Sequence, residues 1–132
     1  MFSTTVSHLQ AYADDTQLLL SFDPFNPEAA AEILNKDLAT VVEFSREHNL
    51  RINPNKTEML LFCSERQRNF LTSRLKIQIE GNLLVFSNCA KNLGLHLDVG
   101  LRFKKHIKTL LQRSYIRTKL LYSNRYILNF KM

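Results

Sequence analysis

The stretch LQAYADDTQLLL at residues 9–20 consists of two apolar arms that meet at adjacent aspartates, Asp14 and Asp15. Two neighbouring carboxylates repel each other, so holding them together is costly unless a turn exposes them to water or a cation lies between them. The arms, residues 7–11 and 17–22, each have the apolar pattern of a short buried strand. The sequence therefore predicts a β-hairpin with both aspartates at or near its tip, a rigid mount suited to a metal site.

The composition of the 132-residue chain, 45% hydrophobic and 23% charged, is ordinary for one globular domain or part of one. It contains no run of about 18 apolar residues that could cross a membrane. Residues 1–7 lack the basic start and the long apolar centre of a signal peptide. We therefore expect an intracellular protein of the cytoplasm or the nucleus, neither secreted nor bound to a membrane.

Charge is distributed unevenly along the chain, although the net value is only +6. All 12 acidic residues lie at or before Asp98, whereas half of the 18 Lys and Arg residues follow it and meet no acid. Such asymmetry indicates a polyanion, nucleic acid foremost, facing the C-terminal segment. The alternatives are a solvated helix face or a basic face that meets acids elsewhere in a longer protein.

A long helix is predicted after the hairpin. Asn26 can cap it, Pro27 suits the first helical position, and Glu28 suits the positive end of the helix dipole. Apolar residues then recur at helical spacing up to about residue 45 and predict a face that packs on a core. The helix should end near His48 and Asn49, because Asn tolerates the left-handed conformation that closes helices.

The segment from residue 50 to residue 98 alternates between short strands and turns. Residues 58–62 have the apolar pattern of a buried strand, and residues 64–73 that of a loop or short helix. Residues 75–80 alternate like a half-buried strand that turns at 81–82 and returns over 83–86. A further short strand is predicted over 92–98, where Gly94 permits either a close approach of another backbone or ligand, or a bulge.

From Leu101 the periodicity becomes helical, and a basic amphipathic helix is predicted. Its apolar stripe comprises Phe103, Ile107, Leu110, Ser114, Thr118 and Leu121, and the bases beside the stripe are Arg102, Lys105, Lys108, Arg113, Arg117 and Lys119. The last residues, 129–132, supply no helix cap, which is the pattern of a truncated segment.

Three motifs resemble those of one family. AYADDT at residues 11–16 resembles the Tyr-x-Asp-Asp signature of reverse transcriptases, and the apolar strand after it is similar to that of LINE-type non-LTR retrotransposon enzymes. LRINPNKTEM at 50–59 resembles the lysine-bearing palm motif that follows in this family after one helix. KNLGLHLD at 91–98 is similar to the Leu-Gly hairpin called the primer grip. Three motifs in this order are more specific than any one alone.

The resemblance implies a C-terminal palm and thumb fragment of an RNA-directed DNA polymerase, α+β in class. Residues 1–98 would form a partial palm of antiparallel β-hairpins with a packed helix, and residues 99–132 the start of a basic helical thumb. Two Mg²⁺ ions, held in the intact enzyme by Asp14 and Asp15, would support in-line nucleotidyl transfer.

Further residue roles follow from the same resemblance. Tyr12 and Ala13 would border the primer and the incoming nucleotide, and Leu93 and Gly94 would help to place the primer end. Lys56 would lie near the triphosphate and protonate the pyrophosphate leaving group, although a surface lysine is the simpler interpretation of that residue by itself. The six bases of the C-terminal helix would hold the duplex of RNA template and DNA primer by its phosphates.

The sequence also departs from the family. A further metal-binding aspartate and the fingers lie upstream of the hairpin in family members, whereas Tyr12 follows only 11 residues here. Asn92 stands where an aromatic residue is frequent. We therefore expect the isolated chain not to polymerise and its hairpin to leave a sheet edge and an apolar face bare. The alternatives are a noncatalytic nucleic-acid-binding module, a retrotransposon relic, or a small α/β domain in which Asp14 and Asp15 form a polar turn.

Overall fold

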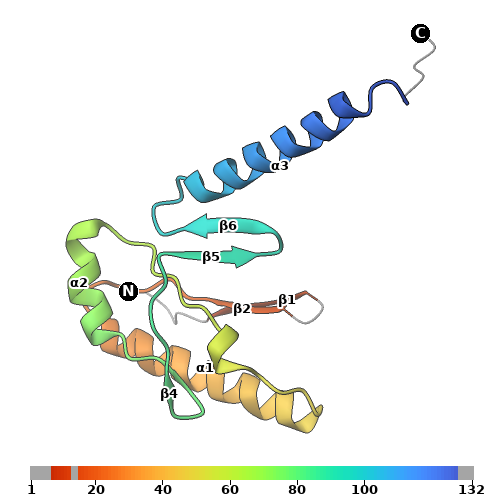
Figure 1. Cartoon of the computed structure of the whole chain (residues 1–132). Helices are drawn as coiled ribbons and strands as arrows, with labels where there is room; N and C mark the ends of the chain where they lie inside the picture. Colours follow the sequence, from red (N-terminus) through yellow and green to blue (C-terminus); the bar gives the residue numbers. More distant parts are fainter. Residues whose placement is uncertain (1–6, 13–14, 128–132) are drawn as a thin grey trace. The chain divides into compact units, whose positions relative to one another are not determined.

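The structure is a computed structural model that describes residues 7–12 and 15–127 (Figure 1). Its elements, in chain order, are β1 (His8–Tyr12), β2 (Asp15–Leu19), α1 (Pro27–Glu47), the 3-10 helix η1 (Pro54–Lys56), α2 (Glu65–Arg74), β3 (Gln78–Ile79), β4 (Asn82–Leu83), β5 (Cys89–Asn92), β6 (Leu95–Asp98) and α3 (Lys104–Ser123). The described strands pair as antiparallel hairpins, β1 with β2, β3 with β4 and β5 with β6. Helices combined with antiparallel hairpins are compatible with the predicted α+β class.

The chain divides into two compact units, one ending at Ser87 and the other beginning at Asn88. The β5–β6 hairpin groups with α3 because α3 packs against β6. The boundary between the two compact units therefore precedes this hairpin. The assignment of either unit to a polymerase palm or thumb stays a prediction.

The boundaries of α1 confirm the helix predicted from sequence. Asn26 accepts a hydrogen bond from the backbone N–H of Ala29 at 3.4 Å, and Pro27 begins the helix. At the other end Asn49 has a φ of 56°, the left-handed conformation that turns the chain away from the helix axis. The capping residues, rather than the apolar pattern, thus determine where this 21-residue helix starts and stops.

The core of the first unit joins α1, α2 and the segments around β3. Its buried side chains are Ala30, Ala31, Leu61, Leu71, Leu75 and Ile77. Leu71 is only 1% exposed, and burial of a leucine side chain stabilises a fold by about 1.5–3 kcal/mol. The burial of Leu75, Ile77 and Ile79 confirms the predicted alternation, although regular pairing in this segment covers only Gln78–Ile79.

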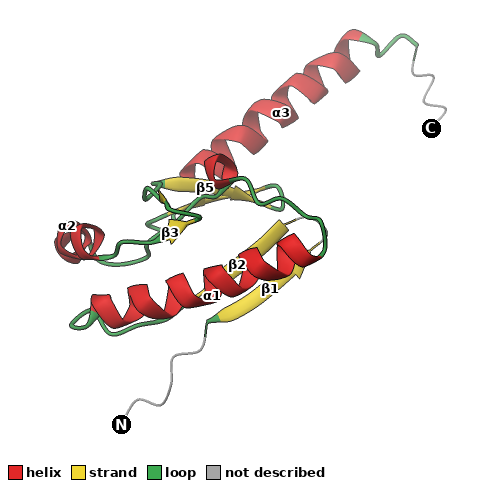
Figure 2. Ribbon diagram, turned by 90° about the horizontal axis from the view of Figure 1, so that it is seen from below, coloured by secondary structure: helices red, strands yellow, loops and turns green. Residues whose placement is uncertain are grey.

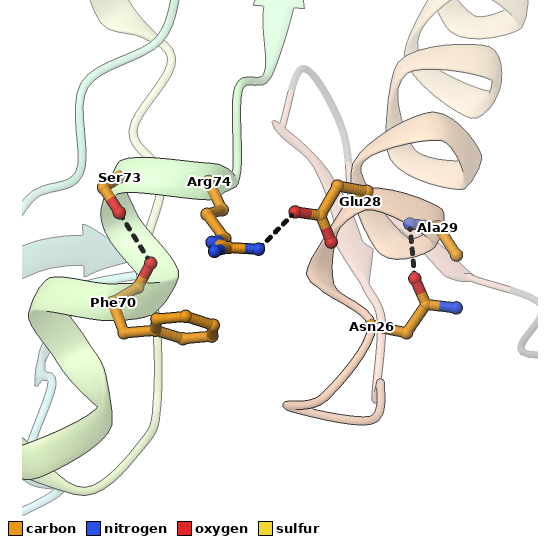
Figure 3. A network of polar contacts seen from close by, with 6 residues as sticks. All are labelled: Asn26, Glu28, Ala29, Phe70, Ser73 and Arg74. Atoms are coloured by element: carbon orange, nitrogen blue, oxygen red, sulfur yellow. Dashed lines mark hydrogen bonds and ion pairs between the residues drawn. The ribbon is translucent and has the colours of Figure 1, made fainter.

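Polar contacts join α2, predicted as a loop or short helix, to the start of α1. The Arg74 guanidinium donates to Glu28 Oε1 at 3.1 Å and lies 4.5 Å from the centroid of the Phe70 ring (Figure 3). Because both charged side chains are largely exposed, this ion pair contributes little to the free energy of unfolding. Its role is to orient the end of α2 toward the first turn of α1.

Asn35 connects α1 to the β3 segment by two hydrogen bonds. Its amide donates to Lys76 O at 3.0 Å, and its carbonyl accepts from Gln78 N at 3.0 Å. The Asn35 amide thus bonds to backbone groups on either side of Ile77, as a paired strand would, and supplies these groups with hydrogen-bond partners. This clamp explains why a strand of only two residues keeps its place.

Three sequence predictions about strands require correction. Residues 58–62 form no extended strand but a single parallel bridge, Met59 with Phe86, although Leu61 is buried as expected. The turn predicted at 81–82 lies one residue earlier, because Glu80 and Gly81 have φ values of 49° and 81° and Asn82 already pairs with Ile79. In the first hairpin, every residue of β1 is exposed rather than buried, so within the described residues its side chains are not covered by a core.

In the second unit, β5 and β6 replace the single strand predicted over 92–98. Leu93 and Gly94 connect them with φ values of 45° and 84°, as a two-residue type I′ turn requires. A Cβ added to Gly94 would meet no atom within 4 Å. This glycine therefore serves the turn, and among the described residues no bulge forms at it and no other backbone approaches it closely.

The predicted basic helix is α3, but its apolar stripe is not covered within the described residues. No residue of α3 is buried, and Ile107, Leu110 and Leu121 are 52%, 47% and 61% exposed. Its junction with β6 is held by Asp98, whose carboxylate accepts from Arg102 N at 2.8 Å and from Lys104 N at 3.2 Å. Asp98 thus supplies the capping oxygens that Phe103, at the N-cap position, does not.

Candidate functional site

The β1–β2 hairpin places Asp15 at its tip, as predicted. Asp15 pairs with Tyr12 across the strands, and the two residues that connect them, Ala13 and Asp14, lie outside the described residues. The predicted places of Ala13 and Asp14 at the hairpin tip therefore stay predictions. Tyr12 is 68% exposed and Asp15 is exposed, so both side chains are accessible to a ligand.

Cross-strand register determines which side chains accompany Asp15. Because paired residues share a face of an antiparallel hairpin and successive residues alternate between faces, Gln10 and Gln17 lie on the same face as Tyr12 and Asp15. The pair Leu9 and Leu18 lies on the opposite face. The face that carries Asp15 is therefore rich in groups that can hydrogen-bond to a polar ligand.

The base of the hairpin, in contrast, is anchored to α1. Ser7, directly before β1, donates a hydrogen bond to the Asp37 carboxylate, and Figure 2 shows the hairpin running along this helix. Leu20 and Phe22, directly after β2, pack against the core cluster. A hairpin fixed at its base and open at its tip presents Asp15 on a supported element.

Lys56 is exposed at the end of η1, a turn that its sequence makes rigid. Asn53 Oδ1 accepts from Asn55 N at 3.0 Å, Pro54 begins the 3-10 turn, and Thr57 Oγ1 donates to Asn53 O at 3.1 Å. Among the described residues, no hydrogen bond or ion pair joins Lys56 to Asp15. The structure thus gives Lys56 a defined mount but does not bring it into contact with the carboxylate.

The predicted primer-binding and backbone-binding residues lie in the second unit. Leu93, 58% exposed, and Gly94 form the tip of the β5–β6 hairpin. The bases predicted to bind phosphate, all exposed, are Arg102, Lys105, Lys108, Arg113, Arg117 and Lys119. Arg102 precedes α3 and the other five lie on it, where no acidic residue opposes them.

Sequence reasoning missed a histidine pair in this unit. The backbone N–H of His96 donates to His106 Nδ1 at 3.4 Å, and the ring centroids are 6.3 Å apart. Burial lowers the pKa of His96, and the positive charges of Lys105, Lys91, His106 and Arg113 lower it further. The hairpin register, which pairs Lys91 with His96, would have revealed this cluster if residues 89–98 had been predicted as two strands.

The residues present fit a magnesium site only in part. Carboxylate oxygens are the ligands that Mg²⁺ prefers, and Asp15 offers them at an exposed tip. Among residues 7–12 and 15–127, however, no group of three His, Cys, Asp or Glu side chains is arranged to hold a metal ion. A complete site at this hairpin would need Asp14 and at least one further ligand.

Within residues 7–12 and 15–127, no helix is long and apolar enough to cross a membrane.

Comparison with known proteins identifies a class, the transposon-encoded RNA-directed DNA polymerases. The relative is described as "Probable RNA-directed DNA polymerase from transposon BS" of Drosophila melanogaster, and it is 34% identical over 123 residues. The similarity covers 93% of this chain and 13% of that protein, so the chain spans only a small part of the relative's length. It confirms the resemblance to a retrotransposon reverse transcriptase that the three motifs indicated. No family model matches the chain, and no solved structure matches it significantly.

Proposed function

We propose that this chain is a C-terminal palm and thumb segment of a non-LTR retrotransposon RNA-directed DNA polymerase. The observation that carries the proposal is the pairing of Tyr12 with Asp15 at an exposed hairpin tip, within a sequence 34% identical to a transposon polymerase along 93% of its length. A Tyr-x-Asp-Asp string alone arises by chance. In this chain the two described residues of the string, Tyr12 and Asp15, pair across a hairpin, which supports the proposal.

In the intact enzyme, Asp14 and Asp15 would hold Mg²⁺ together with a carboxylate from outside this chain. Bound Mg²⁺ would stabilise charge on the attacking and leaving oxygens of nucleotidyl transfer. Tyr12 and Ala13 would border the primer and nucleotide, and Leu93 and Gly94 would position the primer end. The rigid turn at η1 would present Lys56 to the triphosphate, where its ammonium group can donate a proton.

The bases of α3 would bind the RNA–DNA duplex through phosphates without reading sequence. This part of the proposal is supported by the exposure of every base on the helix and by the absence of acids from it. A protein that neutralises phosphates releases counterions, so its affinity falls steeply with salt concentration. The salt dependence therefore measures how many of these bases contact the duplex.

The first experiment measures RNA–DNA duplex binding by fluorescence anisotropy over a range of salt concentrations. Replacing Lys105, Lys108 and Arg113 by Gln should weaken binding and reduce the slope of log K against log salt by about two to three. A matched control replaces three exposed bases of the first unit, Lys36, Arg66 and Lys76, with the same loss of charge. Equal slopes in the two triple variants would contradict the assignment of α3.

The second experiment tests whether the catalytic site is incomplete. Purified 132-residue protein, mixed with a primed RNA template, Mg²⁺ and nucleotides, should give no primer extension. The reason is that, among the described residues, no further acidic side chains join Asp15 to form a metal site. Extension that Asp15→Asn abolishes would overturn the expectation of inactivity.

The alternative function is a noncatalytic nucleic-acid-binding module or a retrotransposon relic, favoured by the wholly basic α3. The genomic sequence upstream of Met1 separates these possibilities. An in-frame aspartate-bearing strand and fingers support the polymerase segment, whereas stop codons there support a relic.

A further inference from the structure

The second unit gathers five groups that are positively charged or can become so, from three different elements. Lys91 of β5 and His96 of β6 are cross-strand partners, so their side chains share one face of the hairpin. From α3, His106 bonds to the His96 backbone, and Lys105 and Arg113 are close enough to lower the pKa of His96. Like charges directly opposite each other destabilise a hairpin.

Within the described residues, no ion pair joins an acid to this cluster. Asp98, the acidic residue on the same hairpin face, already accepts hydrogen bonds from the backbone N–H groups of Arg102 and Lys104. Among the described residues from Asn88 onward, Asp98 is the single acid. An anion from outside the chain is therefore the partner that would relieve the repulsion among these five groups.

We propose that Lys91, His96, Lys105, His106 and Arg113 form a phosphate-binding site for the nucleic-acid backbone, with an affinity that rises as the pH falls. The proposal rests on the proposed function, and it adds to the six predicted bases a lysine and two histidines that were not among them. It also adds a dependence on pH, which lysines and arginines cannot give in the neutral range.

The geometry gives the two histidines different roles. His106 Nδ1 accepts the backbone N–H of His96 at 3.4 Å, which leaves Nε2 as the ring nitrogen that can donate to an anion. The imidazole of His96 makes no such bond in the described part of the chain, and it is the group that can gain a proton when an anion arrives.

The sign of the pH effect follows from the surroundings of His96. In the free protein, burial and the four neighbouring cations hold the pKa of His96 below its usual value. A phosphate beside His96 opposes those cations and raises the pKa, so binding takes up a proton. The extra affinity is complete below the free pKa and disappears as the pH rises through the bound pKa.

The test measures RNA–DNA duplex binding by the full chain between pH 5.5 and pH 8 at constant ionic strength. Affinity should rise about three- to tenfold toward the acid end, because a one-unit difference in the pKa of His96 between free and bound forms corresponds to tenfold. His96→Gln should reduce this change to less than about twofold while leaving the salt slope at pH 8 intact. His48→Gln is the matched control, since His48 lies at the end of α1 and bonds to Phe44 O.

A second measurement needs no variant of His96. Titration of the histidine C–H resonances by NMR should show a pKa for His96 that rises when the duplex, or inorganic phosphate alone, is added. Lys91→Gln should raise the pKa of His96 in the free protein and weaken duplex binding at every pH. A pKa of His96 that stays constant at saturating duplex would overturn the proposal.

The outcomes distinguish this proposal from the proposed function. Duplex binding with the same pH profile in wild type, His96→Gln and His48→Gln would reject the histidine site and leave the polymerase assignment intact. The absence of duplex binding at any pH and at low salt would reject both.

Discussion

The two long helices of this chain are almost equal in length but differ in what holds them. α1, with 21 residues, buries Ala30, Ala31 and Val42 against the first unit, whereas α3, with 20 residues, buries none of its side chains. α1 begins with an acid in its first turn, but α3 begins with two lysines, which are unfavourable at the positive end of a helix dipole.

The comparison shows that amphipathic periodicity predicts a helix but not its partner. Most helical stability in proteins comes from packing of the apolar face against the rest of the fold. α1 receives that packing from its own unit. α3 depends on its junction with β6 and, in our proposal, on the polyanion that its bases bind.

The largest expected difference is in the free energy of unfolding when a leucine is truncated in the core against α1 or on exposed α3. Leu71→Ala removes a side chain that is 1% exposed in the core against α1, and it should lower the free energy of unfolding by about 2–5 kcal/mol. Leu111→Ala on α3, 66% exposed, should change it by less than about 0.5 kcal/mol. Urea denaturation followed by circular dichroism measures both, and equal losses would mean that α3 is packed as tightly as α2 is in the core against α1.

The junction of α3 should be the next most sensitive point. Asp98→Ala removes the hydrogen bonds to the amide of Arg102, just before the helix, and to the amide of Lys104, its first residue, and it should destabilise α3 by about 1–2 kcal/mol. Hydrogen exchange at the amides of Arg102 and Lys104 should accelerate, with unchanged protection in α1. Unaltered exchange at these two amides would show that Asp98 does not hold the helix.

On the first unit, the corresponding connection is the Asn35 clamp. Asn35→Ala removes the bonds to Lys76 O and Gln78 N and should cost about 1–2 kcal/mol. Asn35→Asp keeps the acceptor for Gln78 N but loses the donor, so an intermediate loss is expected. If Asn35→Ala and Asn35→Asp were equally destabilising in urea denaturation, the carbonyl half of the clamp would be shown to contribute nothing.

Local sequence signals predicted those parts of the fold that depend on neighbouring residues. The ends of α1 follow from Asn26, Pro27 and Asn49, and the Tyr12–Asp15 tip follows from two apolar arms around adjacent aspartates. For the candidate site, the sequence indicated the positions of Tyr12, Asp15 and the α3 bases on accessible surfaces.

The parts that sequence could not give depend on contacts between distant residues. Apolar residues 58–62 look like a strand, but Met59 makes only a bridge with Phe86, 27 positions later, because burial of Leu61 does not require a ladder. The Asn35 clamp spans 41 and 43 positions and has no local signature. The histidine pair was missed because Leu93 gives no turn signal, and a strand through residue 93 hides the register that joins Lys91 to His96.

The most local expected effect concerns that turn. Gly94→Ala places a side chain at a φ of 84°, and the left-handed conformation costs a residue other than glycine about 1–2 kcal/mol, less where the turn can relax. Gly100→Ala is the matched control in the same unit, because its φ is not in that region and the nearest atoms to an added Cβ, at 3.7 Å, are ordinary contacts. We expect Gly94→Ala to loosen the Lys91–His96 pairing and shift the His96 resonances, and Gly100→Ala to change neither. Equal effects would mean that the backbone of the Leu93–Gly94 turn does not fix the register on which the histidine site depends.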